Sequence, residues 1–161
     1  MTNPGAMKLT LQGECEIVIT RVFDAPRTLV WNAFTKPELL KQWLIGPPGW
    51  TLAVCQTGAK VGDRYRYVWR GPDGVEMGMG GVVREFVPPE RMVATEKFDQ
   101  SWYPGEAVGT IVLIEQSGRT TLTQTIQYES REAREIALKS PMEQGMNMSY
   151  NRLEGVLASM R

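Results

Sequence analysis

The segment Ser140–Met160, SPMEQGMNMSYNRLEGVLASM, decides the fold that we predict for this chain. Its apolar side chains recur at steps of four, four, three, four and three residues, at Met142, Met146, Tyr150, Leu153, Leu157 and Met160. This spacing places them in one stripe along a helix. A helix with a single apolar stripe has to bury that stripe against another element. We therefore predict a long helix over residues 141–159 that packs on the rest of the chain.

The partner predicted for this helix is a β-sheet, because residues 50–128 consist of short strand-like segments separated by turn residues. The expected strands are residues 14–23, Trp50–Gln56, Asp63–Arg70, Val75–Val87, Arg91–Phe98, Val108–Gln116 and Arg119–Tyr128. The connections after residue 50 are too short for crossover helices, so neighbouring strands must be antiparallel. Gly78, Gly80 and Gly81 in the longest strand suit a bulge or a sharp bend. The prediction is an α+β fold in which a curved, seven-stranded antiparallel sheet surrounds the C-terminal helix.

Shorter helices fill the remaining sequence. Two are expected after the first strand, over residues 26–34 and 36–43, the second opened by a capping box at Thr35-Lys36-Pro37-Glu38. Ser130 is expected to cap a helical turn ahead of the long helix. The length of 161 residues fits one domain. We predict a flexible N-terminal segment at residues 1–12 and a single domain over residues 13–161.

The composition narrows the classes of partner and the compartment. The 18 basic residues balance the 18 acidic ones, so no net charge attracts nucleic acid. No apolar run approaches the roughly 20 residues that a membrane-spanning helix needs, so no membrane insertion is expected. The first residues show no secretory signal, and the two cysteines form no CxxC motif. These features predict a cytoplasmic protein in which Cys15 and Cys55 are free, buried thiols.

The chain contains no histidine. This excludes the nucleophile–histidine pairs of hydrolases and the usual zinc sites, and two distant cysteines cannot hold zinc alone. We therefore expect no metal and no cofactor. Any catalysis would have to use carboxylates, tyrosines, lysines or arginines.

Strand alternation predicts which side chains face the helix. Tyr65, Tyr67 and Trp69 share one face of their strand, and Arg64, Arg66 and Arg70 share the opposite, solvated face. Methionine and aromatic side chains dominate the inward positions, and flexible methionines are common at adaptable binding surfaces. The residues expected around a ligand pocket are Trp43, Trp50, Tyr65, Tyr67, Trp69, Met77, Met79, Phe98, Trp102, Met142, Met146 and Tyr150. The alternative is that the same residues form a filled core.

Two further features bear on function. Glu96 is the one carboxylate that shares the inward face of its strand, and a buried carboxylate with a raised pKa could act as a base. Pairing with an arginine, or an outward twist of the strand, is the structural alternative. The connection Gln100–Glu106 contains Trp102 and Tyr103, which suggests a flap over the pocket mouth.

The order of these segments also resembles a known family, the AHSA1-like (activator of Hsp90 ATPase homologue) branch of the START/Bet v 1-like SRPBCC superfamily. The matching motifs are short but follow in the same order over about residues 15–158. They include Arg21-Val22-Phe23-Asp24-Ala25-Pro26, Val30-Trp31-Asn32-Ala33-Phe34-Thr35, Tyr67-Val68-Trp69-Arg70-Gly71-Pro72-Asp73-Gly74, Val87-Pro88-Pro89-Glu90-Arg91 and Ser149-Tyr150-Asn151-Arg152-Leu153. The resemblance implies the helix-grip fold with an internal cavity. It supplies no catalytic residue.

Three functions remain open at this stage. The first is the binding of a small hydrophobic or aromatic molecule in a cavity between the sheet and the C-terminal helix. The second is an enzyme of the cyclase or hydrolase type that uses the same pocket. The third, which the resemblance suggests, is an interaction module of the Hsp90 co-chaperone kind. The fold alone does not choose among them, and the sequence indicates no oligomeric state.

Overall fold

The computed structural model describes residues 6–160 as eight strands and four helices. In chain order these are β1 (Lys8–Gln12), β2 (Glu16–Phe23), α1 (Arg27–Thr35), α2 (Pro37–Trp43), β3 (Thr51–Gln56), β4 (Arg64–Arg70), β5 (Glu76–Val87), β6 (Arg91–Phe98), β7 (Ala107–Gln116), β8 (Arg119–Gln127), α3 (Arg131–Lys139) and α4 (Met142–Met160). The predicted sequence of a strand, two short helices, a run of strands and a long terminal helix is therefore confirmed.

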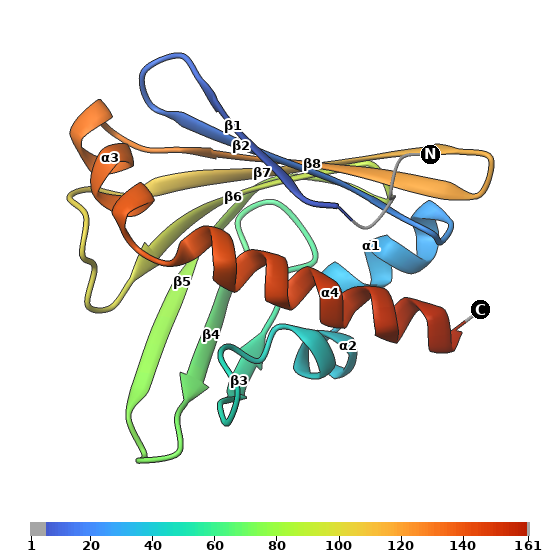
Figure 1. Ribbon diagram of the computed structural model, residues 1–161, viewed down its shortest axis with the longest axis horizontal. Coiled ribbons are helices and arrows are strands. Elements are labelled where there is room, and N and C mark those ends of the chain that lie inside the picture. Colours follow the sequence, from blue (N-terminus) through green and yellow to red (C-terminus); the bar gives the residue numbers. More distant parts are fainter. Residues whose placement is uncertain (1–5, 161) are drawn as a thin grey trace.

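All strands belong to one sheet in the order β1-β2-β8-β7-β6-β5-β4-β3, and every neighbouring pair is antiparallel. Figure 1 shows α4 lying across the concave side of this sheet, with α1 and α2 near its C-terminal half. Because the sheet is one layer and the helices a second, the core lies between them. The α+β helix-grip architecture predicted from the sequence is confirmed.

The sheet has one strand more than predicted. β1 pairs with β2 from Lys8 opposite Thr20 to Gln12 opposite Glu16, so part of the segment expected to be flexible is an ordered edge strand. Gly13 follows it with φ of 57°, a left-handed conformation that glycine adopts at little cost in the turn to β2. The expectation of flexibility was wrong for residues 8–12, and residues 1–5 lie outside the described residues.

The glycines of β5 lie in close contact with the neighbouring strands, whereas the irregularity in the pairing of β5 with β6 lies beyond them, between Val83 and Glu85. A Cβ added to Gly81 would lie 1.9 Å from the carbonyl oxygen of Thr95, and one added to Gly80 would lie 2.8 Å from that of Tyr65. The Thr95 hydroxyl accepts a hydrogen bond from the Val82 amide at 2.8 Å. These glycines therefore let β5 approach its neighbouring strands more closely than any residue with a side chain could.

One predicted helix cap is present and one is not. Ser130 accepts a hydrogen bond from the Ala133 amide at 3.0 Å and caps α3 as expected. The capping box at Thr35 is wrong, because Thr35 belongs to α1 and its hydroxyl donates to the Trp31 carbonyl at 2.8 Å. α2 instead begins with Pro37, whose fixed φ suits the first position of a helix.

The C-terminal half of α4 belongs to the filled core. Leu153 and Leu157 of this half are completely buried, as are Ile17 and Ile19 of β2 and Leu122 of β8 elsewhere in the same core. Burying such a side chain contributes roughly 1.5–3 kcal/mol to the free energy of unfolding. This half of α4 therefore fixes the helix on the sheet.

A buried arginine also joins β2 to α4. Arg21 is 3% exposed, and its Nη1 donates to Oδ1 of Asn151 at 2.9 Å. Desolvation lowers the pKa of Arg21, and the negative charge of Glu154 acts in the opposite direction. The guanidinium group of Arg21 therefore links α4 to the sheet, and it already has a hydrogen-bonding partner within the protein.

Three properties bear on the classes of function considered above. None of the four helices in the described part of the chain has the length and hydropathy needed to cross a membrane. Among residues 6–160, no three potential metal-binding side chains of His, Cys, Asp or Glu lie together. Cys15 and Cys55 are free thiols, as predicted, but they are half-buried, whereas the prediction was that they are buried. Burial raises the pKa of the Cys55 thiol.

Candidate functional site: an internal cavity with a single carboxyl group

A cavity of about 240 Å³ lies between the concave face of the sheet and the N-terminal half of α4. Strands β4, β5, β6, β7 and β8 supply its wall on the sheet side, while α1, α2 and α4 supply the opposite side. The lining residues are Phe34, Thr35, Leu40, Trp43, Leu44, Thr57, Gly58, Tyr65, Tyr67, Trp69, Met79, Val83, Met92, Ala94, Glu96, Gly109, Ile111, Gln124, Gly145, Met146, Ser149 and Tyr150. The wall is mostly apolar and aromatic, which is typical of sites for small organic molecules.

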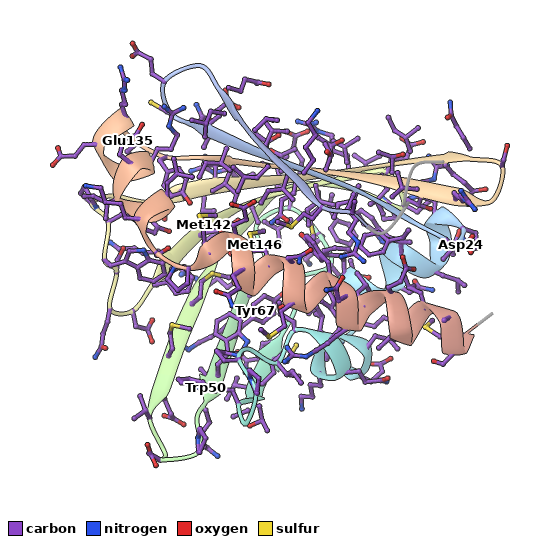
Figure 2. The ribbon with its side chains drawn as sticks, viewed as in Figure 1. Asp24, Trp50, Tyr67, Glu135, Met142 and Met146 are labelled. Atoms are coloured by element: carbon purple, nitrogen blue, oxygen red, sulfur yellow. The ribbon has the colours of Figure 1, made fainter. Side chains whose placement is uncertain are left out.

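The inward aromatic face of β4 is present as predicted. Tyr65 and Tyr67 have ring centroids 5.3 Å apart, and Tyr67 and Trp69 have theirs 6.0 Å apart. Trp69 is held in place because its indole nitrogen donates to the Leu44 carbonyl at 2.9 Å. The alternation of β4 thus places three aromatic rings in a row on its inward face, with Tyr67 beside α4 (Figure 2), while Arg66 on the other face forms an exposed ion pair with Asp99.

The structure brings together most of the residues predicted to surround the pocket. Those that line the cavity are Trp43, Tyr65, Tyr67, Trp69, Met79, Met146 and Tyr150, together with Glu96. Tyr150 and Met146 come from one face of α4, as the apolar stripe of that helix predicted. Trp43 is anchored by a hydrogen bond from its indole nitrogen to the Ala33 carbonyl at 2.9 Å. These residues include positions at the ends of elements, since Trp43 is the last residue of α2 and Trp69 is next to last in β4.

Five predicted residues do not line the cavity, and all lie near the end of an element or in a loop. They are Trp50, Met77, Phe98, Trp102 and Met142. Met77 has the expected parity but is 38% exposed, because the end of the β4–β5 hairpin projects away from α4 (Figure 1). Trp50 packs over Gly71, where an added Cβ would lie 2.8 Å from the indole ring. The alternation of side chains along a strand predicts which of them face inward, but it does not predict which part of the strand is covered by α4.

The predicted flap differs from the observed loop. Trp102 is 41% exposed and stacks on Phe98 at a centroid distance of 4.6 Å, outside the cavity. Tyr103 is 5% exposed and packs edge-on against Tyr128 at 5.1 Å, so the loop is anchored in the core. Among the described residues, none of residues 100–106 contributes to the cavity wall.

Sequence reasoning missed several lining residues, most of which have neither an aromatic ring nor a sulfur atom. These include Leu40 and Leu44 around α2, Thr57 and Gly58 in the β3–β4 loop, Val83, Met92, Ala94, Gly109, Ile111, Gln124, Gly145 and Ser149. The parity of β6 did indicate Met92 and Ala94, which share a face with Glu96. The loop residues gave no comparable signal, because their position depends on tertiary contacts.

Among the described residues that line the cavity, Glu96 is the one carboxylic acid. Its side chain extends over β7 at Gly109, where an added Cβ would lie 2.0 Å from Oε2. Gly109 therefore provides the space in which the carboxyl group lies. Within residues 6–160, no hydrogen bond or ion pair joins Glu96 to another side chain, so the arginine partner considered as an alternative is not there.

The environment of Glu96 favours its neutral form. Burial in the protein interior raises its pKa to about 7, since the charged form loses its hydration. Burial and the negative charge of Glu96 together raise the pKa of Tyr103 to about 12 and those of Tyr65, Tyr67 and Tyr150 well above the usual range. Glu96 is consequently the lining group whose charge changes near neutral pH.

Two tyrosine hydroxyls of the cavity wall are engaged in hydrogen bonds within the protein. The Tyr150 hydroxyl donates to Oε1 of Gln124, and the Tyr65 hydroxyl donates to the Thr95 carbonyl. These bonds leave the Glu96 carboxyl group free to bind a polar atom of a ligand.

The fold and this cavity define the class of helix-grip proteins of the START/Bet v 1 type. Residues 24–158 match the family model described as "Activator of Hsp90 ATPase homolog 1-like protein", and the chain belongs to that family. The resemblance inferred from the sequence motifs is therefore confirmed. A search of curated proteins gives no match.

Solved structures agree with this assignment. A protein from Rhodobacter sphaeroides is 31% identical with a TM-score of 0.90, over 95% of this chain and 98% of the other. One from Chromobacterium violaceum is 27% identical with a TM-score of 0.75, over 90% and 98% of the two chains. The AHSA1 protein from Silicibacter pomeroyi, 19% identical over 91% and 99% of the chains with a TM-score of 0.74, shares the fold.

Proposed function

We propose that this protein binds a small, largely apolar molecule in the cavity under α4. The observation that supports the proposal most directly is the 240 Å³ of unfilled space behind an aromatic and methionine-rich wall. A dry apolar cavity of about 150 Å³ already holds a benzene molecule. The cavity therefore has room for a ligand larger than one aromatic ring. Membership of a family that often binds hydrophobic ligands is consistent with this function.

Filling the cavity tests the proposal. Ala94 lines it from β6, whereas Lys97 on the opposite face of the same strand is exposed. We expect Ala94→Phe to abolish saturable binding of the uncharged aromatic probe N-phenylnaphthylamine, and the control Lys97→Phe to leave it intact. The readouts are probe fluorescence and the intrinsic fluorescence of Trp43 and Trp69, which line the cavity. Equal binding by both variants would place the probe elsewhere and contradict the proposal.

One observation favours a second function, a proton-transferring enzyme of the cyclase or hydrolase type. Glu96 is half-buried, has a pKa of about 7 and lines the cavity together with Tyr67, which suits a general base near neutral pH. An enzyme of this kind would convert the ligand, with Glu96→Gln binding it but failing to turn it over. A bound ligand recovered unchanged after incubation with the wild-type protein supports the binding function instead.

The co-chaperone alternative has less support in the geometry. The large apolar side chains that are exposed come from β1, β5, β7 and three loops: Leu11, Val61, Val75, Met77, Val87, Trp102 and Ile114. Docking surfaces usually present a contiguous apolar patch. The internal cavity is thus the feature that the proposed function uses.

A further inference from the structure

The cavity wall contains an acidic side chain but no basic one among the described residues. Its lining residues include one carboxylic acid, Glu96, and no lysine or arginine among the residues that the structure describes. The buried cation that bonds to α4, Arg21, does not line the cavity, and its Nη1 is bonded to Asn151. A ligand carboxylate or phosphate in this space would meet a like charge and no positive partner.

The aromatic rings of the cavity wall also favour a positively charged ligand. The faces of Trp and Tyr rings carry partial negative charge and attract cations that lie within about 6 Å of the ring centre. Trp43, Tyr67 and Trp69 all contribute such rings to the cavity. A carboxylate and several aromatic rings are the groups that bind an ammonium ion.

Glu96 has the geometry of an anchor for such an ion. Its carboxyl group lies over Gly109, faces the cavity and has no hydrogen-bonding side chain among residues 6–160. Glu96 is half-buried, so its charged form loses part of its hydration without gaining a partner, and a cation that enters the cavity would offset that loss. The apolar part of the molecule would then contact Met79, Ile111 and Met146.

We propose that the ligand of this cavity is an apolar or aromatic molecule with one basic amine, and that Glu96 binds the ammonium group. The inference rests on the proposed binding function and specifies its ligand class. It predicts that the cavity discriminates by charge among molecules of equal size: cations bind most tightly, neutral molecules less tightly, and anions least.

Three probes of one shape test this discrimination by isothermal titration calorimetry: naphthylmethylamine, naphthylmethanol and naphthoate. At about pH 8 we expect the amine to bind at least about tenfold more tightly than the alcohol, as for a charge-assisted pair in place of a neutral one, and naphthoate not to bind measurably. If the alcohol or naphthoate binds as tightly as the amine, the ligand class is wrong while the binding function stands. If none of the three binds, both proposals fail.

Glu96→Gln separates the carboxylate from the rest of the wall. The variant should lose the preference for the amine and keep the affinity for the alcohol. Glu85→Gln is the matched control, because Glu85 is exposed in β5 and pairs with Arg91 at 3.0 Å. Gly109→Ala is a second test, since its Cβ would displace the carboxylate without removing it. Unchanged amine preference in both Glu96→Gln and Gly109→Ala would overturn the assignment to Glu96.

The dependence on pH is a further readout. The other acidic groups that interact with Glu96 are Tyr65 and Tyr67 on β4, Tyr103, Tyr128 and Tyr150 on α4, and their raised pKa values keep them neutral below pH 8. Only the ionised fraction of Glu96 pairs with the ammonium group, so the amine affinity should fall about tenfold from pH 8 to pH 6. Naphthylmethanol in the wild type and the amine in Glu96→Gln should show no such change. A flat amine profile in the wild type would contradict the proposal.

Discussion

The two halves of α4 differ in what they contact, although one apolar stripe runs through both. The C-terminal half contributes Leu153 and Leu157, which are fully buried against the sheet and the short helices. The N-terminal half contributes Gly145, Met146 and Ser149, which face the cavity. The comparison teaches that helical periodicity marks the buried face of a helix but does not distinguish a filled core from the wall of a cavity.

The largest expected effect is on the packed half. Leu153→Ala would leave a void where surrounding side chains are closely packed, and we expect a loss of about 2–5 kcal/mol in the free energy of unfolding. Urea denaturation monitored by circular dichroism measures it. A loss below about 1 kcal/mol would mean that this half is as loosely packed as the other.

An intermediate effect is expected at Glu96, and its sign depends on pH. The pKa of Glu96 is about 7 in the folded protein against 4.5 for the free side chain, so the folded state binds the proton more tightly. Its contribution to stability is therefore greatest below pH 4.5 and is lost as pH rises through 7. We expect Glu96→Gln to raise the free energy of unfolding at pH 8 by roughly 1–3 kcal/mol relative to the wild type.

The measurement is a pair of urea titrations at pH 5 and at pH 8, with Glu85→Gln as the exposed control. The advantage of Glu96→Gln should shrink toward pH 5, where Glu96 is already protonated in the folded protein. A difference that does not change with pH would show that the carboxyl group is ionised or solvated in both conditions.

The smallest expected effect is on the cavity half of α4. Met146→Ala removes a side chain that already faces empty space, so it loses few contacts and should cost only about 1 kcal/mol. Its effect should appear instead in the affinity for an aromatic probe, because part of the wall is removed. If Met146→Ala destabilises the protein as much as Leu153→Ala does, the two halves of α4 do not differ as the structure indicates.

The predicted residues that do not line the cavity lie in loops or near the ends of elements, but a terminal position does not by itself exclude a residue, because Trp43 ends α2, Trp69 is next to last in β4, and both line the cavity. Tyr65, Tyr67 and Trp69 were placed correctly because alternation in β4 fixes their common face. Met77 on β5 also has inward parity, but it lies where the β4–β5 hairpin extends beyond α4. The Trp50 ring packs over Gly71 and not in the cavity. Sequence spacing does not say which inward-facing residues reach the cavity, since that depends on the curvature of the whole sheet.

The sequence by itself determined the α+β class, the order of strands and long helix from residue 14 onward, and the inward position of Glu96. These follow from local periodicity and from backbone sterics, which act within a few residues. The tertiary structure decided that β1 joins the sheet, that an unfilled cavity remains under the first half of α4, and that Gly109 makes room for the Glu96 carboxyl group. A cavity is the space left after distant segments have packed, so no local pattern specifies it.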